Sequence, residues 1–223
     1  MKKTYIEFVT ELLKKQEIGK PIYLNETSKL VAKAYNMSPK KATGAVSVAI
    51  KRIMDGNIIP ELRFYQKGIY YLTVTTPFGE TNIDTEQLIE DKYLKNNNGY
   101  ETGLTLLQKL GLTTQIPKNR ILVTNKAKEC ARFDKKLDVI IHPPKTVIDA
   151  NNKQYLKILD ILEILDNAPI DVKNPYDIIG NYIEKLGLEY VNLLALADNY
   201  YNKDTILKLA HVAGGHLWNY MKI

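Results

Sequence analysis

Residues 38–74 decide the fold of this chain, and they read SPKKATGAVSVAIKRIMDGNIIPELRFYQKGIYYLTV. Pro39 after Ser38 is typical of a helix start, because a serine hydroxyl can cap the first turn and the first helical position needs no N–H. Apolar residues then recur every three or four positions as far as Met54. The spacing predicts an amphipathic helix that ends at Asp55-Gly56-Asn57.

Two β-rich segments follow this helix. Ile58–Phe64 and Ile69–Val74 flank the four-residue connection Tyr65-Gln66-Lys67-Gly68, which predicts a β-hairpin. Upstream, apolar spacing predicts a helix over about residues 4–16, and Asn25 offers an N-cap for another that ends near residue 36. Helices followed by a hairpin in this order are typical of a winged helix-turn-helix, so we predict a DNA-binding domain over residues 1–75.

Residues 76–223 form the second predicted domain, after a linker at Thr75–Gly79. Its predicted elements are a helix capped by Asp84, a helix over about 102–110, strands over 120–124 and 137–142, and helices after Asn151 that include 175–186, 188–200 and 203–220. Gly214-Gly215 is expected to interrupt the last helix with a turn. The predicted fold class is α+β, mostly α with small β elements.

The composition is that of a globular protein. Of 223 residues, 45% are hydrophobic and 25% are charged, which argues against disorder. The single cysteine, Cys130, excludes an intramolecular disulfide, and no charged-then-apolar leader opens the chain. No apolar run approaches the roughly 18–20 residues that a bilayer span requires. We therefore expect a cytoplasmic protein that makes no membrane contact.

Positive charge is concentrated in the first third of the chain. Residues 1–75 hold 13 Lys and Arg against 6 Asp and Glu, whereas the remainder holds 18 against 19 and shows no obvious basic stripe. Because neutralising phosphates drives nucleic-acid affinity, a basic winged helix favours DNA as the partner. The alternative is a lysine-rich solvated surface on a module that binds protein.

The outer face of the helix over 39–54 is predicted to contact DNA. Residues near its N-terminus would meet base edges, those further along would lie nearer phosphates, and residues around the hairpin tip would contact the backbone or minor groove. In that order the candidates are Lys40, Lys41, Thr43, Gly44 and Ser47; Lys51 and Arg52; and Arg63, Tyr65, Gln66 and Lys67. Lys2 and Lys3 could add an N-terminal arm.

Gly44 is unusual within this helix. A glycine in a helix interior costs about 1 kcal/mol relative to alanine, so close approach of a DNA backbone is one explanation, and a kink or tight packing is the rival.

Signatures of catalysis are absent from the sequence. His142, His211 and His216 are scattered, and with one cysteine they give neither zinc-site nor Cys–His spacing. There is no phosphate-binding loop, dinucleotide motif or nucleophile elbow. We predict no catalytic residue, cofactor or metal. The one enzymatic alternative is a metal-dependent nuclease using Asp171 and Lys173 with Asp160 and Asp166, although the Asp-Val-Lys segment has the context of a loop rather than a strand end.

Two segments carry a family resemblance. Gly99-Tyr100-Glu101-Thr102-Gly103 and Leu110-Gly111-Leu112-Thr113-Thr114-Gln115-Ile116-Pro117 resemble the AbiEi family of type IV antitoxins, and the likeness extends through 120–125, 138–144 and 156–165. Gly111 reads as a left-handed cap at a helix end, so this central stretch is interpreted as structural.

The resemblance implies a function for each domain. Antitoxins of this abortive-infection, phage-defence family use the winged helix to read inverted repeats in their own promoter and repress the operon. Their C-terminal domain counteracts a nucleotidyltransferase toxin, and that need not involve a stable complex. The runner-up is a winged-helix transcription factor whose C-terminal domain binds a ligand or dimerises.

Overall fold

The computed structural model describes residues 4–220, with side chains as far as Gly215. Lys2, Lys3 and the side chain of His216 therefore lie outside the described part. Helices make up 51% of the chain and strands 15%, so the fold is α+β and mainly helical, as predicted. The chain divides into two compact units, the first ending at Leu88 and the second beginning at Ile89.

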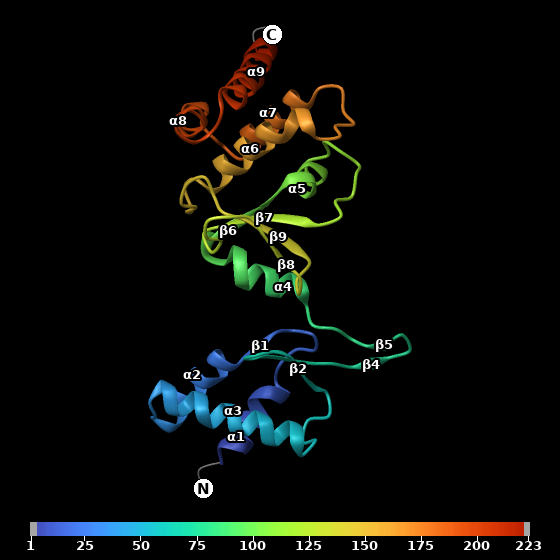
Figure 1. Cartoon of the computed structure of the whole chain (residues 1–223), viewed down its shortest axis with the longest axis vertical. Coiled ribbons are helices and arrows are strands. Elements are labelled where there is room, and N and C mark those ends of the chain that lie inside the picture. The colour runs from blue at the N-terminus through green and yellow to red at the C-terminus, as the bar shows by residue number, and fades with distance from the viewer. Residues whose placement is uncertain (1–3, 221–223) are drawn as a thin grey trace. The chain divides into compact units, whose positions relative to one another are not determined.

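Unit 1 has the element order of a winged helix (Figure 1). Its elements are α1 (Tyr5–Lys14), β1 (Ile22–Tyr23), α2 (Leu24–Tyr35), α3 (Pro39–Asp55), β2 (Leu62–Gln66) and β3 (Ile69–Leu72). The strands pair antiparallel in the order β1-β3-β2. The apolar stripes of α1 and α3 meet in one core with Leu62 and Leu72 of the sheet.

Several helix and strand ends in unit 1 differ from those predicted. Thr4 caps α1 through a capping box with Glu7, whereas Ser38 makes no side-chain cap although Pro39 does occupy the first turn of α3. The N-cap of α2 is Tyr23 rather than Asn25. In the wing, β2 begins at Leu62, and only two residues, Lys67 and Gly68, separate it from β3, Gly68 with a φ of 79°.

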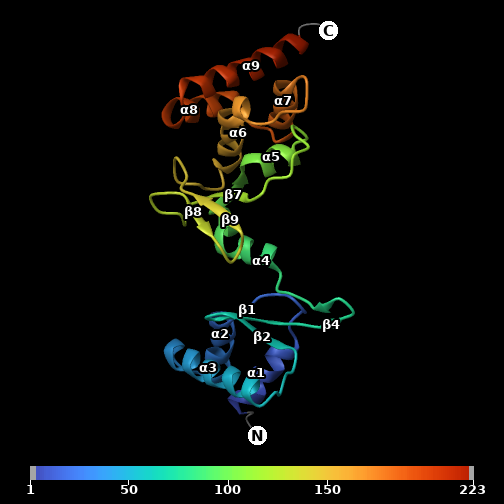
Figure 2. The same cartoon turned by 45° about the vertical axis from the view of Figure 1, so that its right-hand side comes forward.

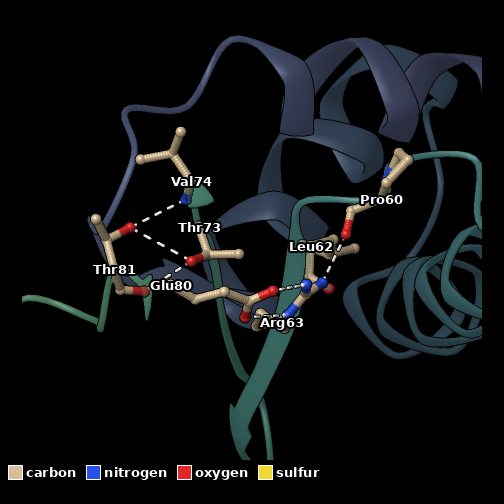
Figure 3. Close-up of polar contacts among 7 residues, drawn as sticks. All are labelled: Pro60, Leu62, Arg63, Thr73, Val74, Glu80 and Thr81. Atoms are coloured by element: carbon tan, nitrogen blue, oxygen red, sulfur yellow. Dashed lines mark hydrogen bonds and ion pairs between the residues drawn. The ribbon is translucent and has the colours of Figure 1, made fainter. Parts of the chain in front are cut away.

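The predicted linker after the wing is a second, short hairpin. β4 (Thr75–Thr76) pairs antiparallel with β5 (Gly79–Glu80). The Thr73 hydroxyl donates to the Thr81 carbonyl at 2.7 Å, and the Thr81 hydroxyl accepts from the Val74 amide at 3.0 Å (Figure 3). These contacts tie the segment to the wing, which explains why unit 1 extends beyond the predicted boundary at residue 75.

Unit 2 begins with a sheet that has helices on both faces (Figures 1 and 2). The helix α4 (Thr85–Ile89) contains the boundary between the units, after Leu88, and runs into η1 (Glu90–Leu94) and η2 (Lys95–Asn97). The elements that follow are β6 (Gly99–Thr102), α5 (Gly103–Lys109), β7 (Arg120–Thr124), β8 (Arg132–Asp134) and β9 (Val139–His142). The strand order is β6-β7-β9-β8, with β7 and β9 parallel. The sequence predicted β7 at its observed bounds and missed β6 and β8.

The rest of unit 2 is helical, as predicted. It consists of α6 (Lys153–Ile164), η3 (Leu165–Asn167), α7 (Pro175–Lys185), α8 (Tyr190–Tyr200) and α9 (Lys203–Tyr220). α9 continues through Gly214 and Gly215, where a turn was expected. The fully buried apolar side of α6, which includes Ile158 and Leu162, forms the core with α5, α7, α8 and α9. Within the described residues, no helix has the length and apolar character to cross a bilayer.

Candidate nucleic-acid interface

α3 exposes most of the residues predicted to read DNA. Ala42, Val46 and Ile50 are buried on its inner side. The outer side presents predicted contact residues to solvent: Lys40, Lys41, Gly44, Ser47, Lys51 and Arg52. Thr43 differs, because it is half-buried and its hydroxyl donates to the Pro39 carbonyl at 2.9 Å. The helix therefore brings six of its seven candidates to one exposed side.

Val48 was missed in the sequence and lies among these candidates. Its side chain is 51% exposed, although valine is apolar. It borders a groove of about 360 Å³ with Lys51 and Phe64, and another of about 440 Å³ with Gly44 and Tyr5. Sequence alone could have identified it, because position 48 falls between positions 44 and 52 on the outer side of the helical wheel.

Gly44 has no role inside the fold that would explain its missing side chain. A Cβ atom built on this residue meets no neighbouring atom within 4 Å, and α3 runs unbroken from Pro39 to Asp55. Both rival explanations, a kink and tight packing, are therefore contradicted. Of the explanations that the sequence offered for Gly44, close approach of a DNA backbone is the one that the fold does not contradict.

Gly44→Ala is expected to stabilise unit 1 and to weaken its binding. Alanine removes the helix penalty, so the free energy of unfolding rises by about 0.5–1 kcal/mol. On a helix that docks against DNA, as the sequence predicts for α3, the new methyl group would stand between the DNA and the helix backbone, so we expect promoter affinity to fall by about tenfold. Chemical denaturation and gel shifts measure the two effects. A variant that is more stable and binds as tightly as the parent protein would remove Gly44 from the interface.

The predicted DNA contacts of the wing, the hairpin of β2 and β3, lie in two places. Lys67 is exposed in the turn, and Tyr65 and Gln66 lie half-buried at the end of β2, where the register shifts. Arg63 lies further from the tip, and its guanidinium is held by three groups (Figure 3). It donates from Nε and Nη2 to Glu80 at 3.0 and 2.5 Å, and from Nη1 to the carbonyls of Pro60 at 2.6 Å and Leu62 at 3.2 Å. Arg63 thus joins the wing to the second hairpin.

The hydrogen bond with Arg63 lowers the pKa of Glu80, and the same contact raises the pKa of Arg63. A second pair, Lys20 with Asp84 at 2.8 Å, lowers the pKa of that aspartate chiefly through its hydrogen bond. With the observed boundary, residues 1–88 hold 13 Lys and Arg against 9 Asp and Glu. The added acids are therefore partly matched by cations away from α3.

The cations of α3 differ from these paired ones. Within the part of the chain that the structure describes, no ion pair is recorded for Lys40, Lys41, Lys51, Arg52 or Lys67. Unmatched cations on one helix face and at the wing turn give this side of unit 1 its positive potential. A surface of this kind suits a phosphate backbone.

In unit 2, the residues of the family-like motif hold the fold together. A Cβ on Gly99 would lie 2.6 Å from the Val123 carbonyl oxygen and 2.7 Å from that of Tyr93, so only glycine fits there. Gly111 has a φ of 73° and ends α5, and the Leu112 amide donates to the Leu107 carbonyl. This is the left-handed cap that the sequence predicted.

The same motif supplies polar contacts. Burial favours a higher pKa for Glu101, but its ion pairs with Lys109 and with Arg120 lower it overall. Thr114 donates to Asp171 from its amide at 2.6 Å and from its hydroxyl at 2.7 Å. Those hydrogen bonds lower the pKa of Asp171.

Asp160 is the buried acid of unit 2. Its carboxylate accepts from the Tyr100 hydroxyl at 2.9 Å and from the Tyr201 hydroxyl at 2.6 Å. Burial raises its pKa from 3.8 to about 6, and the two tyrosine hydrogen bonds offset part of that effect. The residue therefore links β6, α6 and the start of the α8–α9 connection.

The acids required by the nuclease alternative do not converge. Asp160 faces two tyrosines, Asp166 pairs with Lys208 at 2.8 Å, and Asp171 bonds Thr114. Among the residues that the structure describes, no three His, Cys, Asp or Glu side chains lie close enough to share a metal ion. This geometry gives that alternative no support.

No known family model matches this sequence, and no curated protein matches it either. Among solved structures, the chain is similar to the crystal structure of the RV2827C protein from Mycobacterium tuberculosis. The two chains are 12% identical with a TM-score of 0.45, and the match covers 95% of this chain and 77% of that one. Function therefore has to be inferred from the residues themselves.

Proposed function

We propose that unit 1 binds double-stranded DNA with α3 in the major groove and the wing turn on the adjacent backbone. The observation that carries this proposal is the outer side of α3, where unpaired cations surround a glycine that the fold itself does not require. A helix inserted into the major groove must approach the base edges closely, and its flanking lysines neutralise phosphates. The DNA would be the protein's own promoter.

Replacing Lys40 and Lys51 by alanine is expected to weaken promoter binding and to flatten its salt dependence. Each lost phosphate contact removes about one unit from the slope of log affinity against log salt. The matched control replaces Lys14 and Lys15, which are exposed at the C-terminal end of α1. A salt-series gel shift of the full chain on promoter and scrambled DNA measures both.

The outcomes of this experiment separate the possibilities. A lower slope for the α3 variant alone supports the proposed docking. An unchanged slope and affinity in that variant would refute it, and equal binding to scrambled DNA would reduce unit 1 to a non-specific or protein-binding module.

For the whole chain, we propose a repressor and antitoxin of the AbiEi type. The support is the resemblance at residues 99–117, together with a winged helix in front of a separately folded unit. Unit 1 would repress the operon and unit 2 would counteract a nucleotidyltransferase toxin. We assign no residue of unit 2 to that activity. The contacts that the structure shows for the motif residues stabilise the fold.

Co-expression with the neighbouring nucleotidyltransferase gene tests the antitoxin proposal. The full chain, and the Lys40→Ala/Lys51→Ala variant, are expected to restore growth equally, because antitoxicity belongs to unit 2. The toxin is expressed from an unrelated promoter, so that repression cannot mimic protection. Failure of the folded full chain to protect, or the absence of any such gene beside it, would favour a transcription factor without a toxin.

A further inference from the structure

The half of unit 2 that contains the sheet has a net positive charge. The net charge of the whole unit does not show this. Residues 89–148 hold 11 Lys and Arg against 6 Asp and Glu, whereas residues 149–223 hold 7 against 10. The acids of the helical half therefore cancel an excess of cations that lies elsewhere in the fold. This is why the sequence showed no basic stripe after residue 75.

The excess lies along the free edge of the sheet. β8 is the outermost strand in the order β6-β7-β9-β8 (Figure 2). The strand and its flanking loops expose five cations: Lys126, Lys128, Arg132, Lys135 and Lys136. Three acids, Glu129, Asp134 and Asp138, accompany them, so the segment keeps an excess of cations. Asp134 already accepts from Lys92 at 2.6 Å and from the Tyr93 hydroxyl at 2.8 Å. Because Lys92 neutralises it, Asp134 does little to offset the cations along the edge.

An exposed aromatic ring lies within this row of cations. Phe133 is 49% exposed at the middle of β8. In the sequence it follows Arg132, whose side chain alternates to the other face of the same edge, and it precedes the exposed Lys135 and Lys136 of the following turn. It pairs with Ile140 of β9, so both side chains lie on the same face of the sheet. Ile140 is itself only partly buried. The helices therefore leave this corner of the sheet uncovered.

Cations in a row with an aromatic platform match the chemistry of an unpaired nucleic-acid strand. The backbone phosphates of such a strand follow the cations, and an unstacked base lies on the ring. Bases in a duplex are already stacked on one another and offer a phenylalanine at the surface no free face.

We propose that the β8 edge of unit 2 binds single-stranded nucleic acid, with a base stacked on Phe133 and phosphates held by Arg132 and Lys135. This site is separate from α3 and does not depend on the proposed duplex binding. RNA and single-stranded DNA share the chemistry, and the experiment distinguishes them.

The test uses the full chain carrying Lys40→Ala and Lys51→Ala, so that the α3 surface contributes little. Fluorescence anisotropy measures its affinity for labelled oligonucleotides of about 12 nucleotides, as RNA, as single-stranded DNA and as duplex. Phe133→Ala is expected to weaken single-strand binding by about tenfold, and Phe133→Tyr to retain it, because tyrosine preserves the ring. Arg132→Ala with Lys135→Ala lowers affinity and flattens the salt slope.

Leu207→Ala is the matched control, because Leu207 is an exposed apolar residue of α9 in the acidic half of unit 2. Its affinity is expected to match that of the parent protein. Tighter binding of RNA or of single-stranded DNA supports the site and identifies the polymer. Single-strand binding that survives Phe133→Ala, or a preference for the duplex that depends on Arg132 and Lys135, would overturn the proposal.

Discussion

Gly99→Ala is expected to lower the free energy of unfolding of unit 2 by about 3 kcal/mol. The added methyl group would lie within 2.7 Å of the carbonyl oxygens of Val123 and Tyr93, closer than any real side chain approaches. Both atoms belong to the backbone, so neither can rotate away. The strand β6 would have to separate from β7, where Gly99 pairs with Thr124.

Hydrogen exchange measured by mass spectrometry on the full chain locates this effect. Peptides covering β6 and β7 should exchange faster in the variant, whereas peptides from α3 should not change. Gly214→Ala is the control, because a Cβ at that position in α9 meets nothing within 4 Å. Normal protection of β6 in Gly99→Ala would mean that the strand accommodates the methyl group, and the close packing inferred at this position would be wrong.

The free energy of unfolding of unit 2 is expected to change by about 3 kcal/mol with pH because of Asp160, and Asp160→Asn is expected to remove that change. The pKa of Asp160 is about 6 in the folded protein, against 3.8 for an ordinary aspartate. Below pH 4 the group is protonated in both the folded and unfolded states and contributes nothing. Between pH 4 and 6 only the unfolded chain loses its proton, so the folded state becomes progressively less favoured, and above pH 6 the penalty is constant.

The free energy of unfolding of the variant relative to the parent protein should therefore rise between pH 4 and pH 7. Denaturant unfolding at a series of pH values measures it. Asp171→Asn is the control of opposite sign, because hydrogen bonds from Thr114 lower the pKa of Asp171 and its stabilisation is lost as the pH falls. A difference between Asp160→Asn and the parent that stays constant with pH would show that Asp160 titrates normally.

Periodicity in the sequence correctly predicted most of the helices. α3, α7, α8 and α9 lie within two residues of their predicted ends, because each buries one apolar stripe that repeats at helical spacing. The turn expected within α9 at Gly214-Gly215 was wrong. The strand β7 was also correct, since its run of β-branched and leucine residues is buried on a sheet. Such patterns depend on near neighbours in the chain.

The missed elements are short or unusual in composition. β6 reads Gly-Tyr-Glu-Thr and β8 reads Arg-Phe-Asp, so neither shows an apolar alternation. Each becomes a strand because a neighbour offers hydrogen bonds, β7 for the one and β9 for the other. The hairpin of β4 and β5 was interpreted as a linker for the same reason.

The candidate sites show the same division. The sequence predicted the outer side of α3, since a helical wheel places Lys40, Gly44 and Lys51 together. It could not predict that Arg63 is held by Glu80, or that Asp160 meets tyrosines 60 and 41 residues away in the chain. It also could not locate the basic edge at β8, because acids of the helical half balanced the count.

The sequence by itself determined the amphipathic helices, their order along the chain and the basic face of α3, because these depend on contacts within a few residues. Only the tertiary structure decided where unit 1 ends, which carboxylate is buried, and which strand forms the free edge. These features depend on pairings between distant residues, whose free energy comes from a partner that local sequence does not specify.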